Sequence, residues 1–289
     1  MTIHDFCTNP MILLALLAGL AAAILGGTVG TFVVVRRISF ISGSISHSIL
    51  AGIGLCLLLE RTYHLPGLSP LLGALVTAIL SALIIAKVEQ THRERSDSII
   101  ATIWAAGMAI GIILIAKTPG YTAELSNVLI GNILWVTPGD VITLFGLALL
   151  SLLFVTLNFQ KLKLLSFDGD EAALQGIKTE RLYRQLLILV AMSVVALTQV
   201  VGIVLVMTML TLPPLLASLY CKRLSSTIIG AIGVSILCTI LGLIAAATFD
   251  WPAGASIAVI SVVLFLLGVV WMQTRQRKHV VTDKLLLQK

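Results

Sequence analysis

His47 is the residue whose chemistry is hardest to explain by its neighbours in the sequence. It stands inside an apolar segment that follows Arg36 and Arg37, whereas every other ionisable side chain can be placed in a loop or at the end of an apolar run. An ionisable group within hydrocarbon is costly and is a functional candidate by default. An imidazole binds metals and exchanges protons near neutral pH. Three roles remain open: a buried neutral histidine bonded to a serine hydroxyl, a ligand on a translocation path, or a proton relay.

The residues near this histidine can form only a weak metal site. A stable site needs three or four ligands, and no HxxxH, HExxH or carboxylate partner accompanies the imidazole. Weak binding suits a transport path, because the ion has to leave again. The sequence also has no GxxxxGK[ST] phosphate loop and no GxSxG elbow. We therefore expect a chain that is not an enzyme and does not itself hydrolyse ATP.

The segment around the histidine is rich in small residues at helical spacing. On a helix, Ser44, Ser48 and Gly52 form one row, and Gly43 lies one turn before the imidazole. Such rows let two helices approach closely. We predict that this helix is packed inside a bundle, with the imidazole facing a cavity or a partner helix. The glycines of the preceding segment, Gly26-Gly27-Thr28-Val29-Gly30, are likewise interpreted as helix-packing residues.

The composition is that of a protein that crosses a membrane many times. Hydrophobic residues make up 58% of the chain and charged residues 11%, whereas soluble proteins average about 25% charged residues. The mean hydropathy is +1.07. The four cysteines have no CxxC spacing and are interpreted as small apolar residues. The net charge of +6 does not by itself indicate nucleic-acid binding, because the interpretation depends on where the basic residues lie along the chain. No Lys or Arg precedes the first apolar run, so we expect a retained span rather than a cleaved signal.

Apolar runs of about 20 residues, enough to cross roughly 30 Å of hydrocarbon, recur along the chain. The run 185–221 is too long for one crossing, so we predict two that break near Gly202, with Pro213 and Pro214 disturbing the second. Residues 121–137 are mixed and predict a short helix or a re-entrant turn. The result is an all-α transmembrane bundle of nine spans, or seven if the long run does not fully cross. The other predicted spans are 11–35, 43–59, 68–86, 98–116, 138–158, 225–248 and 253–273.

The basic residues orient this bundle. Of the 19 Lys and Arg residues, only Arg61 and Lys117 fall on one side of the predicted spans. Because basic loops stay in the cytoplasm, we predict that the N-terminus is outside and the C-terminus is cytoplasmic. Every loop is short, so residues 1–289 are expected to form a single transmembrane domain embedded in lipid.

The longest polar stretch, residues 159–184, lies on the cytoplasmic side in this topology. Asp168 can cap a short helix whose first turn is acidic, and Gly176 can end it. A short, rigid helix between two spans could dock a soluble partner, and it could equally be an ordinary connector.

The sequence resembles the membrane permease subunits of bacterial ABC importers for zinc, manganese and iron, the ABC-3 permease family. No single motif is specific, but several occur in the family's order on a matching topology. The matching segments are Arg36-Arg37 with Ser46-His47-Ser48-Ile49-Leu50-Ala51-Gly52, Gly131-Asn132-Ile133-Leu134 with Asp140, Phe167-Asp168 with Ala172 and Gly176-Ile177, Val201-Gly202-Ile203-Val204-Leu205-Val206 with Leu210-Thr211-Leu212-Pro213, and Asp250-Trp251-Pro252-Ala253-Gly254.

The resemblance implies a homodimeric pore in the bacterial inner membrane. Its partners would be a cytoplasmic ATP-binding cassette subunit, which binds the ATP, and an extracytoplasmic metal-binding protein. No cofactor would be bound permanently, and the divalent metal would be the cargo. The cytoplasmic loop would be the coupling helix on the ATPase, with Asp168, Glu171, Ala172 and Gly176 as its family positions. Gly202 and Pro213 would belong to the helix packing along the pathway.

In this family the histidine that matches His47 is associated with the metal path. An aspartate commonly lies four residues earlier on the same helix face, and here that position is Gly43. The resemblance then leaves two copies of His47 across a dimer axis, with possible assistance from Ser44, Ser46 or Ser48. Fewer hard oxygen ligands favour zinc modestly over manganese.

Two other classes of function remain open. A self-contained secondary transporter or channel would need intramembrane carboxylates, and the sequence offers none. A non-transporting scaffold or intramembrane enzyme would make His47 a structural residue.

Overall fold

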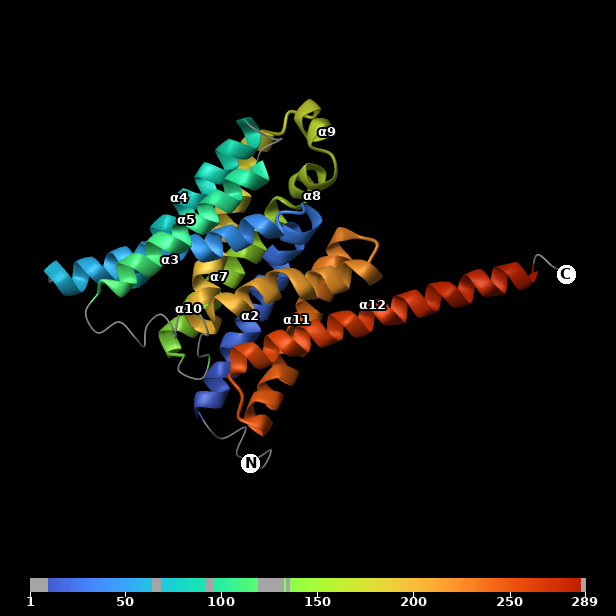
Figure 1. Ribbon diagram of the computed structural model, residues 1–289. Helices are drawn as coiled ribbons and strands as arrows, with labels where there is room; N and C mark the ends of the chain where they lie inside the picture. Colours follow the sequence, from blue (N-terminus) through green and yellow to red (C-terminus); the bar gives the residue numbers. More distant parts are fainter. Residues whose placement is uncertain (1–9, 64–68, 92–95, 119–132, 134–135, 287–289) are drawn as a thin grey trace.

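The computed structural model describes residues 10–63, 69–91, 96–118, 133 and 136–286. Every regular element within these residues is a helix, which confirms the all-α prediction (Figure 1). The helices are α2 (Pro10–Val35), α3 (Ser39–Tyr63), α4 (Pro70–Thr91), α5 (Ser96–Ala116), α7 (Pro138–Leu157), α8 (Phe159–Phe167), α9 (Gly169–Leu174), α10 (Thr179–Tyr220), α11 (Leu224–Phe249) and α12 (Ala253–Leu286). Most of the predicted segment 121–137 lies outside the described residues.

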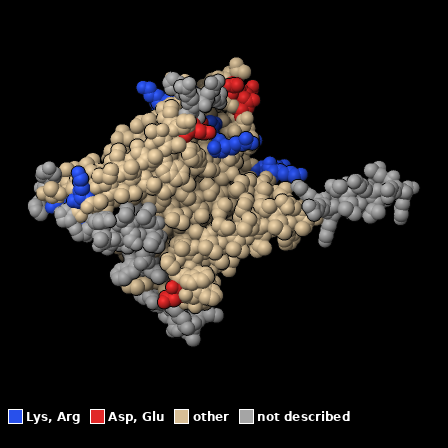
Figure 2. Space-filling model, viewed as in Figure 1, with Lys and Arg blue, Asp and Glu red and all other residues tan. Residues whose placement is uncertain are grey.

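Eight of the described helices are long and apolar enough to cross a membrane. The long ones carry no broad polar face, and many large apolar side chains on α5, α7, α11 and α12 are exposed, as lipid-facing positions would be. Figure 2 shows a wide zone without Lys, Arg, Asp or Glu on the face in view, with charged residues gathered towards α9. The protein is therefore a multi-pass membrane protein. The side on which each terminus lies stays a prediction from the charges of the loops.

Helix α10 folds back on itself at Gly202. Its 42 residues include one non-helical position, Gly202, at φ 77° and ψ 162°. Tyr183 lies against Arg36, the residue directly after α2, while Leu210 contacts Gly30 of α2, only six positions earlier in the chain. A straight helix would separate Tyr183 from Leu210 by about 40 Å. The two halves of α10 therefore cross separately, and together with the other seven spanning helices they give nine crossings within the described residues, the number predicted.

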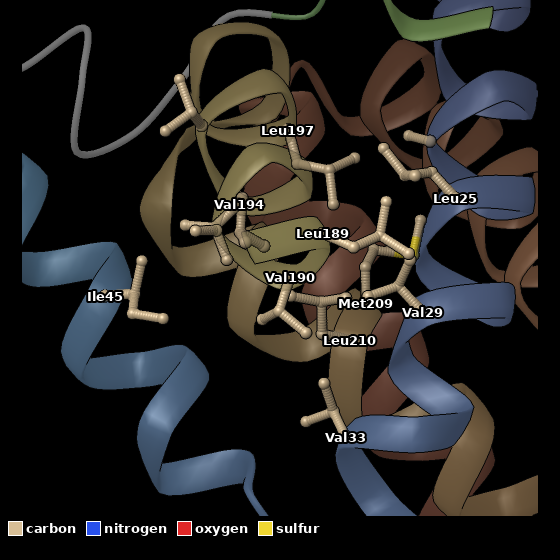
Figure 3. Packing of buried hydrophobic residues seen from close by; sticks show 14 of the residues in the cluster. Leu25, Val29, Val33, Ile45, Leu189, Val190, Val194, Leu197, Met209 and Leu210 are labelled. Atoms are coloured by element: carbon tan, nitrogen blue, oxygen red, sulfur yellow. The ribbon is translucent and has the colours of Figure 1, made fainter. Parts of the chain in front are cut away.

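Helix α2 packs against both halves of α10 and against α11, and its buried face makes much of the core. Figure 3 shows Leu25, Val29 and Val33 of α2 turned towards Leu189, Val190, Met209 and Leu210 of α10. Helix α3 packs mainly against α4 and α5. The bundle thus has two packed groups, joined where α10 contacts α2, α3 and α4.

The predicted packing role of the first glycine cluster is confirmed, and the structure gives its reason. We predicted that Pro213 and Pro214 would disturb the second half of α10. The helix continues through both prolines, so the disturbance is limited to lost hydrogen bonds. Prolines lack an N–H, so the carbonyls of Met209 and Leu210 lose their usual helical donors. Both carbonyls point at α2: a Cβ on Gly26 would lie 3.3 Å from the Met209 oxygen, and one on Gly30 would lie 2.5 Å from the Leu210 oxygen.

Candidate metal path and coupling site

His47 lies in the third turn of α3, about 12 Å along the helix axis from Ser39. Helix α3 begins four residues before the predicted span 43–59, and the arginine pair lies in the three-residue connection between α2 and α3. The imidazole stacks on Trp104 of α5, with ring centroids 4.6 Å apart and an angle of 11° between the planes. Its Nδ1 atom is buried and has no hydrogen-bond partner. A buried polar atom left unpaired costs about 1–3 kcal/mol, so this nitrogen calls for an explanation.

The three serines named with His47 do not hydrogen-bond to it in this structure. Ser44 donates to the Ile100 carbonyl across to α5 at 2.9 Å, and Ser46 donates to Ser42 of its own helix at 2.9 Å. Ser48 shares a 2.9 Å hydrogen bond with Ser81 of α4. These hydroxyls tie α3 to its neighbours, and their predicted assistance to a metal stays a prediction.

The small-residue row places α3 close to both of its neighbours, as predicted. The backbone of Gly52 lies directly against that of Gly73 on α4, and a Cβ on either would overlap the other's carbonyl. On the other side, a Cβ on Gly107 of α5 would lie 2.5 Å from the Cα of Ser48. Between Ile41 and Gly54, helix α3 is thus an interior segment in which His47 and Ala51 alone are partly accessible.

Gly43, one turn before His47, faces a space that is already occupied. A Cβ on Gly43 would lie 2.6 Å from Cε and 3.3 Å from Sδ of Met207, and 3.4 Å from Cζ3 of Trp104. Met207 belongs to the second half of α10. The imidazole, the indole and the thioether therefore converge from α3, α5 and α10. Neither Trp104 nor Met207 was predicted from the sequence, because each is one apolar residue among many in its span.

A mainly apolar cavity of about 460 Å³ lies farther along α3, on the side of His47 away from Arg36. Its wall includes Ile49 and Ile53 of α3, Pro70 of α4, and Val195 and Gln199 of α10. Gln199 donates to Asp140 at 3.4 Å, and Asp140 also forms a capping box with Thr137 at the start of α7. Asp140 thus lies at the start of a helix, where a carboxylate is favoured.

The polar stretch 159–184 forms two short helices followed by the start of α10. The predicted capped helix is α9: Asp168 accepts a hydrogen bond from the Glu171 N–H at 2.9 Å, and Gly176 ends the turn at φ 77°. Ala172 is fully buried. Helix α8 was not predicted, and its Leu162 and Leu165 anchor it to the bundle. Phe167 and Leu174 are 69% and 84% exposed, although they lie outside the spanning helices.

Arg36 connects this short-helix segment to three spanning helices. Its guanidinium lies 4.8 Å from the centre of the Tyr183 ring and donates to the Leu165 carbonyl. The Tyr183 hydroxyl in turn donates to Glu89 at the end of α4. Arg36, Glu89 and Tyr183 line a cavity of about 530 Å³ together with residues of α8 and α9. One contact network thus joins the ends of α2, α4, α8 and α10, and sequence reasoning did not foresee the parts of Glu89 and Tyr183.

These features define a class of protein: a multi-pass helical membrane protein whose interior carries an imidazole and whose one end carries a short capped helix. The family model for the ABC 3 transport family matches residues 8–272, and the chain belongs to that family. It is therefore a membrane permease of a metal-transport family.

Individual relatives agree with this assignment. A "Probable metal transport system membrane protein" of Chlamydia trachomatis is 42% identical over 251 residues, which cover 87% of this chain and 85% of the relative. The "Manganese import system permease protein ScaB" of Streptococcus gordonii is 31% identical over 92% of each chain. Among solved structures, "PsaBC from Streptococcus pneumoniae in complex with Fab" is similar at a TM-score of 0.80 and 29% identity, over 92% of this chain and 93% of the other.

Proposed function

We propose that this chain forms the translocation path of an ATP-driven importer for divalent transition metals, of the group zinc, manganese and iron. Two copies would form the path, a separate cytoplasmic subunit would bind and hydrolyse ATP, and an extracytoplasmic protein would deliver the metal. ScaB and its manganese-transporting relatives support the cargo class, and the site of this chain supports the route.

The observation that carries the proposal is the unpaired Nδ1 of His47, inside a bundle whose described charged residues lie towards helix ends, in connections or in the α8–α9 segment. The lone pair of a neutral imidazole nitrogen is a good ligand for a transition metal. One imidazole binds such an ion weakly, and a second copy of the chain would add a second imidazole. Weak, shared ligation fits an ion that must be released after each step.

The short helix α9 is suited to receive the movement of an ATPase. Its acidic first turn and Asp168 cap make it a rigid unit. Phe167 and Leu174 expose apolar surface beside charged residues, which is the surface pattern of a protein–protein contact. Arg36 then links the carbonyl of Leu165 to Tyr183 on α10, so a shift of the α8–α9 segment acts directly on two spanning helices.

The alternative of a self-contained secondary transporter gains no support from the described residues. Ion coupling in such transporters uses carboxylates within the membrane. Among the side chains that the structure describes, the carboxylates lie at helix ends or in the α8–α9 segment: Glu60, Glu89, Asp97, Asp140, Asp168, Asp170, Glu171, Glu180 and Asp250.

Uptake by the whole transporter in proteoliposomes tests the proposal. We expect ATP-dependent uptake of zinc, manganese or iron by wild type, loss of uptake in His47→Gln, and no uptake when the ATPase subunit is omitted. Gln keeps a polar side chain of similar length without the imidazole. A lipid-facing substitution, Gly233→Ala, should leave uptake unchanged, because nothing lies within 4 Å of its new methyl group. Normal uptake by His47→Gln, or uptake without the ATPase, would refute the proposal.

A further inference from the structure

We propose that Met207 determines which metal this permease carries, because its thioether is the second metal contact of the path beside His47. The site would then favour borderline ions such as Zn²⁺ over the harder Mn²⁺. This inference rests on the proposed function, since it assumes that the ion passes His47.

The geometry around Gly43 places the thioether beside the imidazole. Gly43 and His47 are one helical turn apart, so side chains at these positions lie on one face, about 6 Å from each other. The Sδ atom of Met207 is 3.3 Å from the point where a Cβ of Gly43 would stand. Trp104 touches that same point and stacks on His47. The Met207 methyl group, with the sulfur next to it, therefore fills the space that a side chain at position 43 would use, on the helix face that also carries the imidazole.

No harder ligand competes for this place among the described residues. The hydroxyls of Ser44, Ser46 and Ser48 have partners elsewhere, and the described carboxylates lie at helix ends or in the α8–α9 segment. What remains at the site is one imidazole nitrogen without a hydrogen bond and one thioether on a half-buried, flexible side chain. The donors at the site that take part in no described hydrogen bond are therefore one nitrogen and one sulfur in each copy.

The chemistry of these donors decides the preference. Imidazole suits zinc, and soft sulfur ligands select zinc and softer ions, whereas manganese prefers carboxylate, carbonyl and water oxygens. Position 43 could have supplied a carboxylate, but a glycine there supplies none. The missing carboxylate at position 43 and the sulfur of Met207 both favour Zn²⁺ over Mn²⁺.

The break in α10 is what brings the methionine to the site. Gly202 has a backbone conformation that is essentially restricted to glycine. The second half of α10 therefore restarts in a new direction, and Met207, in its second turn, reaches α3. Met207 and Met209 are two residues apart and point differently: Met209 is buried against Gly26 of α2, which makes it a matched control.

The test compares Met207→Leu with Met209→Leu in the whole transporter reconstituted with its ATPase subunit. Leucine keeps the bulk of methionine and removes the sulfur. Uptake is measured with ZnCl₂ and MnCl₂, separately and in competition. We expect Met207→Leu to lower the ratio of Zn²⁺ to Mn²⁺ uptake about tenfold, the size of effect that loss of a metal-site interaction produces. Met209→Leu should keep the wild-type ratio. An unchanged ratio in Met207→Leu would overturn the inference.

X-ray absorption of the zinc-loaded transporter gives a second readout. We expect a sulfur neighbour of zinc in wild type and in Met209→Leu, and none in Met207→Leu. A zinc spectrum without sulfur in wild type also overturns the inference. His47→Gln separates the two proposals: if it abolishes uptake while Met207→Leu keeps the wild-type ratio, the path through His47 stands and the role of Met207 fails. If His47→Gln transports normally, both fail.

Discussion

The contact between Gly30 and Leu210 predicts a large effect from a single methyl group. In Gly30→Ala the new Cβ would stand 2.5 Å from the Leu210 oxygen and 3.0 Å from its carbonyl carbon and Cα. Carbon and a carbonyl oxygen normally approach to about 3.3 Å. The obstacle is backbone, so no rotation of a side chain relieves it, and α2 and α10 must move apart by roughly 0.8 Å at this point, the difference from that normal contact.

The energetic consequence follows from this separation. A radial gap of 0.5–1 Å forfeits about a quarter to a half of the dispersion energy of each atom pair it opens. Overpacking a tight interface in this way costs about 1–3 kcal/mol. Gly26→Ala should cost less, because its Cβ would lie 3.3 Å from the Met209 oxygen. Gly233→Ala should be neutral or stabilising by up to about 1 kcal/mol, because alanine favours the helix and nothing lies within 4 Å.

The assay is thermal unfolding of the purified permease in one detergent, with uptake measured in parallel. The expected order of midpoints is Gly233→Ala, at or above wild type, then Gly26→Ala, then Gly30→Ala. Equal midpoints for Gly30→Ala and Gly233→Ala would refute the reasoning, since the two variants differ in what the methyl group meets and not in the substitution itself.

Three further outcomes are expected. Gly202→Ala should destabilise the permease by about 1–3 kcal/mol, because only glycine readily adopts φ 77° with ψ 162°, and unfolding midpoints equal to wild type would contradict this. Asp168→Ala should weaken α9 by about 1 kcal/mol through loss of its cap and so increase the ATP hydrolysed per ion transported, whereas Asp170→Ala, an equal charge change without the cap, should not. Tyr183→Phe removes the hydroxyl that donates to Glu89 but keeps the ring beside the guanidinium, so we expect the same ratio to rise with little change in ATPase activity.

Much of this architecture follows from local sequence signals. Apolar runs of membrane-spanning length define the helices, and the run 185–221 had to break because it was too long for one crossing. Gly202 was the predicted break because glycine alone readily leaves the helical region there. Asp168 and Gly176 were predicted from the capping preferences that the structure shows. In each of these cases the cause lies within a few residues of the effect.

The residues that sequence analysis missed depend on contacts between distant segments. Met207 and Trp104 resemble any apolar residue of a span, and only the direction in which α10 restarts brings the thioether to Gly43. Tyr183 and Glu89 are 94 positions apart and meet because α10 begins beside the end of α4. Helix α8 was not predicted because it is only nine residues long, has no side-chain cap, and buries only two leucines.

Helix α10 occupies a particular place in this arrangement, because its two halves serve the two ends of the proposed cycle. The first half begins at Tyr183, inside the contact network that holds the α8–α9 segment, and the second half carries Met207 to the imidazole. The prolines that follow leave the carbonyls of Met209 and Leu210 directed at the glycines of α2, the helix that directly precedes Arg36. A shift of Arg36 therefore acts on both halves of α10: directly on the first half through the Tyr183 ring, and on the second half through α2 and its glycine contacts. Tight packing of this kind transmits displacements because it cannot deform locally. The glycine contacts are thus as much a part of the proposed coupling as the short helix that would meet the ATPase.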